Sequence, residues 1–499
     1  MKGLINITSN DKKCFLATLF AGIITYWFSL SNFTMSIDNE GGNLFYQKIG
    51  IGRFGGAFLK ETILPSPYSP FFTTFVMVFF LASSFFLASK YLKLNFFQSI
   101  AFCVLGITFP VMFYQADFHI QSDTVGIAFF CSVLSSVILS SAIKSISNLY
   151  VFSLLLVISI ILFSFSISVY QSLATVAPCL FIMKEYRITF DNKYRLKINK
   201  IIVFISWCIA SILLYKVSAD LIKGYYGVVS SSYLPNKFAW AKEPLLENLS
   251  LIYENFKISL FGGLFFGSFI YIFATVSFVV LLVSNLISGR LLSVLLLIAI
   301  YIAPFALLIA LASYQPPRTY TLLPLTYAFF VSSLIGLISK EHFQKLVAAC
   351  ISAVSLWYGA SVHSQLFFSD AMQWKADTET ASQIVTTIRI KYPEYKDGIT
   401  PVYFHGAYNT TNPWKPVNSD VFGSSFFAWD GGNNWRIANF YESSMIAKIK
   451  QPTLQQALKA SKMVNDIPSW PSSESITMKD GIVVVKLGNR TGYLGNLKK

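Results

Sequence analysis

Charged residues are scarce in this chain. Only 13% of its 499 residues are Asp, Glu, Lys or Arg, whereas soluble globular proteins contain about 25%. Apolar residues make up 54% of the sequence and gather in runs of about 20 residues, the length of a membrane-spanning helix. These proportions exclude an ordinary soluble enzyme and indicate a protein that crosses a membrane several times.

Motifs for the common nucleotide, metal and nucleophile sites are missing as well. The sequence has no Walker loop, no dinucleotide fingerprint, no zinc motif and no serine-hydrolase elbow. Its six cysteines fall inside or at the edge of apolar runs and form no CxxC pair. We therefore expect no disulfide framework and no zinc or redox centre. We also expect no required cofactor, while the sequence leaves a divalent metal ion open.

The net charge of +15 has two explanations. A nucleic-acid-binding protein would interleave aromatic and basic residues, but here the aromatic residues lie in the apolar runs, so we expect no nucleic-acid partner. Lys and Arg instead concentrate in alternate connections between the runs, as the positive-inside rule describes. This asymmetry predicts a cytoplasmic N-terminus and a C-terminus on the outer face.

The apolar runs predict a polytopic helix bundle. Eleven spans are expected, near residues 14–33, 71–89, 96–114, 125–143, 149–166, 168–184, 201–219, 258–283, 291–313, 321–338 and 346–366. The assignment is weakest in the stretch 149–184, which the sequence SVYQS interrupts, and a single span followed by a re-entrant segment is the alternative there. Ionisable residues are nearly absent from the spans, which disfavours an ion-coupled transporter.

The composition changes after residue 366. We divide the chain into a membrane-embedded module, 1–366, and an outer α/β domain, 367–499, whose polar content is ordinary. The pattern of the second part predicts helices near 373–392 and 451–464, and strands at 401–405 and 481–487. The stretch between them, through Trp414, Trp429 and Trp435, reads as irregular.

The first outer connection holds a dense polar cluster. Asp38 and Glu40 follow a span by only a few residues, and Arg53 and Lys60 come shortly afterwards. A carboxylate beside apolar surface has a raised pKa and is a stronger base, so Asp38 and Glu40 are candidate catalytic residues. Apolar residues between 41 and 63 recur at helical spacing, which predicts an amphipathic helix in the interface. The alternative is that these charges only cap the ends of spans.

Other outer segments supply polar groups of matching chemistry. Arg53, Lys60 and Arg318 are the candidate ligands of a donor phosphate, because guanidinium and ammonium groups suit that anion. A lone histidine in a loop, such as His119, is more often a solvated surface residue than a catalyst. The candidate residues for binding sugar and acceptor are Asp117, His119, Tyr170, Gln171, Tyr320, Trp429, Asp430, Trp435 and Arg436. No metal ligands are predicted.

Several of these segments together resemble a known family. They are the acidic first outer loop with GIGRFGG at 50–56, SVYQSL at 168–173, PPRTY at 316–320, and the C-terminal stretches FFAWDGGNNWR, SWPSSESI and DGIVVVKLG. The combination resembles the serotype-converting O-antigen glucosyltransferases and covers nearly the whole chain.

The resemblance implies a GT-C-type fold in the bacterial inner membrane with an active site facing the periplasm. It implies an undecaprenyl-phosphate-glucose donor, a lipid-linked O-antigen acceptor, contact with membrane lipid, and cooperation with a donor synthase and a donor flippase. By the same resemblance, Asp38 and Glu40 form the acidic pair and Arg53 is the loop arginine, with either carboxylate as the base.

Two other functions fit the same features. A flippase or transporter of lipid-linked sugar would share the apolar bulk and the outer loops but would form no glycosidic bond. A GT-C transferase for another sugar or acceptor, such as lipid A or a protein, would share the chemistry. The sequence alone does not choose the sugar, the acceptor position or the linkage.

Overall fold

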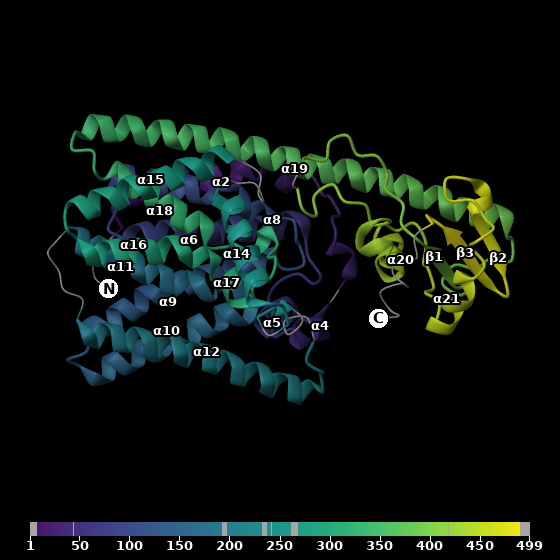
Figure 1. Cartoon of the computed structure of the whole chain (residues 1–499), viewed down its shortest axis with the longest axis horizontal. Coiled ribbons are helices and arrows are strands. Elements are labelled where there is room, and N and C mark those ends of the chain that lie inside the picture. Colours follow the sequence, from purple (N-terminus) through teal and green to yellow (C-terminus); the bar gives the residue numbers. More distant parts are fainter. Residues whose placement is uncertain are drawn as a thin grey trace. The chain divides into compact units, whose positions relative to one another are not determined.

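The computed structural model describes residues 7–42, 44–191, 197–231, 237–240, 242–260, 268–417 and 419–489, and the chain is mainly helical (Figure 1). It divides into two compact units. Met1–Ser31 and Leu44–Ser364 form the first, here called the membrane unit, and Asn32–Asn43 and Gln365–Lys499 form the second, the C-terminal unit. The segment that carries Asp38 and Glu40 therefore packs with the C-terminal part of the chain.

The described helices of the membrane unit follow one another closely. They are α2 (Ser9–Thr25), α3 (Trp27–Ser31), α4 (Phe45–Gly50), α5 (Phe54–Thr62), α6 (Pro70–Tyr91), α7 (Phe96–Ile107), α8 (Phe113–Ala116), α9 (Ser122–Lys144), α10 (Leu149–Val169), α11 (Val176–Asp191), α12 (Ile198–Tyr226), α14 (Leu245–Leu260), α15 (Ser268–Ile287), α16 (Leu291–Ile302), α17 (Ala306–Leu311) and α18 (Leu323–Ile335). The long helix α19 (Glu341–Lys391) begins in this unit and ends in the C-terminal unit.

Eight helical segments in the described residues are long and apolar enough to cross a membrane: Pro70–Tyr91, Phe96–Ala116, Ser122–Lys144, Leu149–Val169, Ile198–Tyr226, Phe269–Ile287, Leu291–Leu311 and Glu341–Lys391. Each overlaps a predicted span, so the multi-pass character of the protein is confirmed. The span predicted at 258–283 overlaps its helix only from Phe269 onward, and residues 261–267 lie outside the described residues. The predicted spans 14–33, 168–184 and 321–338 overlap shorter helices, which are α2 with α3, α11, and α18; α11 begins only at Val176. The break predicted inside 149–184 lies at Tyr170, where α10 ends.

Local sequence explains where these helices begin and how they pack. The N-terminus of α2 has a capping box, in which Thr8 and Asp11 bond each other's backbone N–H. Pro70, which needs no hydrogen-bond acceptor for its nitrogen, opens α6. Gly126 of α9 lies so close to α6 that a Cβ atom there would come within 2.8 Å of the Cα of Met77. A glycine is therefore required where these two helices approach most closely.

The segment 41–63 is not the single amphipathic helix expected from its apolar spacing. It forms two short helices, α4 and α5, which are separated by a turn at Gly52. Gly52 has φ +80°, and its Cα is so close to the hydroxyl of Tyr215 that a side chain would collide with it. The turn ends the first helix and makes Arg53 the N-cap residue of the second.

The C-terminal unit contains a small mixed sheet. Its remaining elements are β1 (Val402–His405), α20 (Asn434–Ser443), α21 (Leu454–Ser461), β2 (Ile476–Lys479) and β3 (Ile482–Lys486). The strand order is β1-β3-β2, with β1 parallel and β2 antiparallel to β3. The predicted strands 401–405 and 481–487 are present, and the predicted helix 451–464 corresponds to α21. The helix predicted at 373–392 is not a separate element but the end of α19, continuous with the last predicted span, and α20 and β2 were not anticipated.

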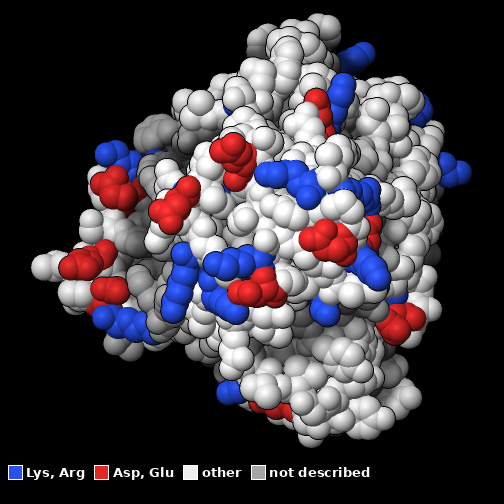
Figure 2. Space-filling view, turned by 90° about the vertical axis from the view of Figure 1, so that its right-hand side faces the viewer, with Lys and Arg blue, Asp and Glu red and all other residues white. Residues whose placement is uncertain are grey.

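A buried apolar cluster holds α21 against this sheet. It consists of Tyr403, Ala457, Ala460, Val464, Ile482 and Val484. Such a buried core is typical of a folded domain. Figure 2 shows one face of the molecule, on which acidic and basic side chains are interspersed.

Candidate functional site

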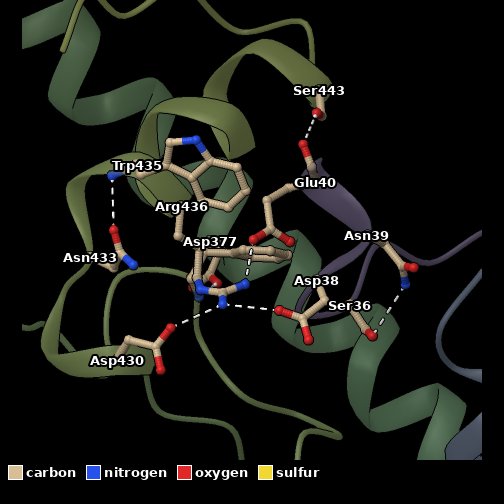
Figure 3. A network of polar contacts seen from close by, with 11 residues as sticks. Ser36, Asp38, Asn39, Glu40, Asp377, Asp430, Asn433, Trp435, Arg436 and Ser443 are labelled. Carbon is tan, nitrogen blue, oxygen red and sulfur yellow. Dashed lines mark hydrogen bonds and ion pairs between the residues drawn. The ribbon is translucent and has the colours of Figure 1, made fainter. Parts of the chain in front are cut away.

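Three carboxylates surround one arginine in the C-terminal unit (Figure 3). Nη2 of Arg436 lies 3.0 Å from Oδ1 of Asp38 and 3.0 Å from Oδ2 of Asp430. Nη1 donates a short hydrogen bond to Oε1 of Glu40. We call these four residues the Arg436 cluster. The structure thus brings both predicted catalytic carboxylates together with two of the predicted acceptor-binding residues.

The members of the Arg436 cluster differ in their exposure to water. The side chains of Glu40 and Arg436 are 0% and 7% exposed, whereas those of Asp38 and Asp430 are 39% and 47% exposed. Burial raises the pKa of Glu40 to about 7, although the attraction of Arg436 lowers it. Glu40 is therefore a carboxylate that both gains and loses a proton near neutral pH, as a general base requires.

Short segments with unusual backbones present these carboxylates. Asp38 and Asp430 both have positive φ angles, 77° and 53°, in the left-handed region that aspartate tolerates better than most residues. Asp38 precedes the 3-10 turn Asn39–Gly41, and Asp430 lies within the turn Trp429–Gly431. Backbone strain of this kind is found most often at functional sites.

Helix α20 carries Arg436 and is fixed to the strand β1 and to the first outer loop. The side chain of Asn434 pairs with the backbone of Phe404 through two hydrogen bonds of 2.8 Å. At the other end of α20, Ser443 donates a hydrogen bond of 3.0 Å to the carbonyl of Glu40. Arg436 is therefore held on a rigid helix whose two ends are anchored.

A buried aspartate on α19 shapes the loop that leads to Asp430. Oδ1 of Asp377 accepts a hydrogen bond from Ser425 at 2.8 Å, and Oδ2 accepts one from the backbone N–H of Phe426, also at 2.8 Å. Gln373 and Thr410 donate to the same carboxylate. Because all these bonds are satisfied, we assign Asp377 a structural role in positioning the loop.

Arg53 makes its contacts within the membrane unit. Its Nε donates to Oε1 of Gln171 at 3.1 Å, and Nη1 donates to Oε1 of Gln121 at 3.3 Å. The guanidinium carbon lies 4.5 Å from the ring centroid of Tyr170, a cation–π contact. The predicted residues Arg53, Tyr170 and Gln171 thus form one group, which is joined by Gln121.

The loop between α8 and α9 is buried, and the surface position expected for His119 was wrong. Asp117 and His119 are 1% and 2% exposed, and the ring of His119 packs against that of Tyr68. Burial, followed by the charge of Lys60, lowers the pKa of His119 to about 4. His119 is therefore neutral at physiological pH. Lys60 itself forms a buried ion pair with Asp123, with 2.7 Å between Nζ and Oδ2.

Arg318 and Tyr320 lie in and just after a short 3-10 turn, Pro317–Thr319. The guanidinium of Arg318 lies over the ring of Phe118, 4.3 Å from the ring centroid. The backbone carbonyl of Arg318 accepts a hydrogen bond of 2.6 Å from the side chain of Gln115. Tyr320 is buried and packs edge-on against Phe305. In the C-terminal unit, Trp435 is 39% exposed and Trp429 is partly buried.

Sequence reasoning predicted Gln171 but missed two other amide side chains that contact the arginines, Gln121 and Gln115. Gln121 contacts both Arg53 and Gln115, and Gln115 in turn contacts the backbone of Arg318. Both glutamines belong to the outer segment that contains Asp117 and His119. The sequence shows that these polar residues are close together along the chain, but it does not show that the glutamines contact Arg53 and Arg318. Across the described ranges, no three His, Cys, Asp or Glu side chains are grouped so that they could hold a metal ion.

Comparison with protein families gives a match to glucosyl transferase GtrII over residues 27–335. The chain belongs to this family. The match spans more than half of the sequence and includes Asp38, Glu40, Arg53 and Arg318, while Arg436 lies beyond it. Searches among curated proteins and among solved structures give no match.

Membership of the GtrII family confirms the resemblance drawn from the sequence. It implies transferase activity on sugar donor and acceptor substrates, and O-antigen glucosylation.

Proposed function

We propose that the protein transfers glucose from undecaprenyl-phosphate-glucose to lipid-linked O-antigen units on the periplasmic face of the bacterial inner membrane. The proposal rests first on the family match. The single structural observation that supports it best is the Arg436 cluster, in which a buried carboxylate has a pKa near neutrality. We further propose the GT-C architecture and the eleven-span topology, with the C-terminal unit in the periplasm.

In the proposed reaction, Glu40 acts as the general base. It removes the proton from an acceptor hydroxyl, whose oxygen attacks the anomeric carbon while the bond from that carbon to the lipid phosphate breaks. One in-line displacement inverts the anomeric configuration. Asp38, the more exposed carboxylate, is the alternative base, and Arg436 keeps both carboxylates oriented.

The leaving lipid phosphate needs a cation. Arg53 suits this role because its planar guanidinium is already held by Tyr170, Gln171 and Gln121. The role of Arg318 as a second phosphate ligand stays a prediction. The roles of Glu40 and Arg53 are proposed separately, each from contacts within its own unit.

Exposed aromatic and acidic groups in the C-terminal unit suit an acceptor polysaccharide. Trp435 presents a partly exposed ring on which a sugar can stack. Asp430, from the same stretch of sequence, has an exposed carboxylate that can accept hydrogen bonds. We propose both as acceptor ligands, with Trp429 in the same turn.

Reconstitution tests this function directly. Purified protein is mixed with polyprenyl-phosphate-glucose and candidate lipid-linked glycans, and the products are analysed by mass spectrometry. A glycan heavier by one hexose supports the proposal. Movement of lipid-glucose across a vesicle membrane with no new glycosidic bond would instead identify a flippase, and transfer of another sugar would identify a different transferase.

The rate should depend on pH with an inflection near 7. Glu40 must be ionised to accept a proton, and burial raises its pKa to about 7. We expect kcat to be constant above this pH and to fall about tenfold for each further unit of acidification. Initial rates at saturating donor, measured across the neutral and acidic range, check this. A flat profile through neutrality would exclude Glu40 as the base.

Replacing Arg53 with alanine should lower kcat/KM for the donor by about 10- to 100-fold, because one charge-assisted contact to phosphate is lost. Replacing Arg53 with lysine should restore only part of the lost kcat/KM. An ammonium group cannot keep the hydrogen bonds to Gln171 and Gln121 together with the stacking on Tyr170. Arg389→Ala, which removes an exposed ion pair with Asp397, serves as the control. Kinetics at the wild-type level in Arg53→Ala would remove its role.

A further inference from the structure

Three cations from the first outer connection converge on four consecutive residues, 120–123. Nζ of Lys48, on α4, donates to the carbonyl of Ile120 at 3.0 Å. Nη1 of Arg53 donates to Gln121, and Nζ of Lys60, on α5, bonds Asp123. All these residues belong to the membrane unit. The sequence had indicated Arg53 and Lys60 here, but not Lys48.

The three cations differ in how their charge is balanced. Lys60 is paired with Asp123 at 2.7 Å, and both side chains are buried. In the described part of the chain, no carboxylate lies within ion-pair distance of Lys48 or Arg53. Lys60 therefore has its counter-ion among the described residues, whereas Lys48 and Arg53 have none there.

The surroundings of Lys48 disfavour its positive charge. Burial, followed by repulsion from Lys60, lowers the pKa of Lys48 to about 8; Asp123 opposes the shift, and Arg53 adds to it. A partly buried ammonium ion beside two other cations is stabilised by a bound anion.

Arg53 is oriented without being neutralised. Its two hydrogen-bond acceptors among the described residues are the amide oxygens of Gln171 and Gln121, which fix the plane of the guanidinium but carry no charge. Nη2 donates to none of the described residues. The full positive charge and at least one N–H edge of Arg53 therefore remain for a ligand.

We propose that Lys48 and Arg53 together bind one phosphate group, and that Lys60 is held by Asp123 as part of the scaffold of this site. The ligand is a phosphate ester. The identification of this ester as the polyprenyl phosphate of the donor rests on the proposed function. A phospholipid headgroup would offer the same phosphate chemistry to the site. Lys48 thereby takes the role that the sequence suggested for Lys60.

Binding of polyprenyl phosphate to the purified full-length protein tests the proposal, with transfer from polyprenyl-phosphate-glucose measured in parallel. We expect Lys48→Gln to weaken binding by at least about tenfold, the effect of one charge-assisted contact, and Lys48→Arg to retain most of it. Gln121→Glu should also weaken binding, because the new carboxylate neutralises Arg53 in place. Lys216→Gln, at an exposed lysine of α12, is the matched control.

The outcomes separate this inference from the proposed function. Wild-type binding in Lys48→Gln and in Gln121→Glu would overturn the phosphate site, even if transfer by the wild-type protein succeeds. Binding of phosphatidylglycerol that depends on Lys48, with no binding of polyprenyl phosphate, would assign the site to a headgroup and overturn its place in the donor site. Failure of the wild-type protein to transfer glucose would count against the proposed function, while binding that depends on Lys48 would still support the phosphate site.

Discussion

Replacing Glu40 with glutamine is expected to lower kcat by about 10²- to 10⁴-fold, the range that general-base catalysis contributes. Glutamine has the shape of glutamate, and its side-chain oxygen can still accept the hydrogen bond from Arg436. The segment Asn39–Gly41 should therefore keep its place on α20. What is lost is the ability to accept a proton, so membrane protein levels and donor binding should stay close to those of the wild type.

Transfer of glucose by purified variants measures this effect. Glu442→Gln removes an exposed carboxylate from the same helix as Arg436 and is the matched control. Asp38→Asn is compared under the same conditions. A large loss in Asp38→Asn with little loss in Glu40→Gln would move the base to Asp38, and full activity in both variants would place it outside the Arg436 cluster.

The spans were predictable because a membrane imposes a simple rule on sequence. Each crossing needs about 20 apolar residues with its backbone bonded internally, and hydropathy reads this directly. The rule is less informative for shorter helices such as α11 and α18, whose length depends on packing rather than on the thickness of the bilayer. Eight predicted spans therefore have full-length helices and three have shorter ones.

The elements missed in the C-terminal unit have weak local signals. The strand β2, with sequence ITMK, ends in lysine and is only four residues long; it is defined by pairing with β3. Helix α20 begins with Asn434 and Trp435, which have lower helix propensity than Ala or Leu, and its position depends on the pairing of Asn434 with Phe404. Both elements form because of tertiary contacts, so the sequence pattern alone could not predict them.

The candidate site was predicted as residue types but not as partners. Asp38 and Glu40 were identified from their place after a span, yet their guanidinium partner is Arg436, from the other end of the chain. Ion pairs between such distant residues leave no periodic pattern. Lys48 was overlooked for a related reason, because its lack of a counter-ion becomes visible only when the partner of Lys60 is known.

Replacing Arg436 with alanine is expected to have the largest effect on stability. It leaves Glu40 buried beside two other carboxylates with no opposite charge, and breaking a buried ion pair in this way costs about 3–5 kcal/mol. The attraction of Arg436 also lowers the pKa of Glu40, so its removal should shift the pH inflection of the reaction above 7. Thermal unfolding and the pH profile of transfer measure the two effects separately.

A double variant distinguishes the structural role of Arg436 from the chemistry of Glu40. Arg436→Met combined with Glu40→Gln removes both charges, and neutral replacement of a buried pair is often tolerated. We expect this protein to regain most of the stability lost in Arg436→Ala while remaining inactive, because the base is absent. Arg436→Lys keeps a charge but cannot contact Glu40 and Asp38 through separate nitrogens, so it should be intermediate in both properties. Double-variant stability as low as the sum of the single losses would show that Arg436 and Glu40 are not coupled, and it would remove the ion pair as the reason for their arrangement.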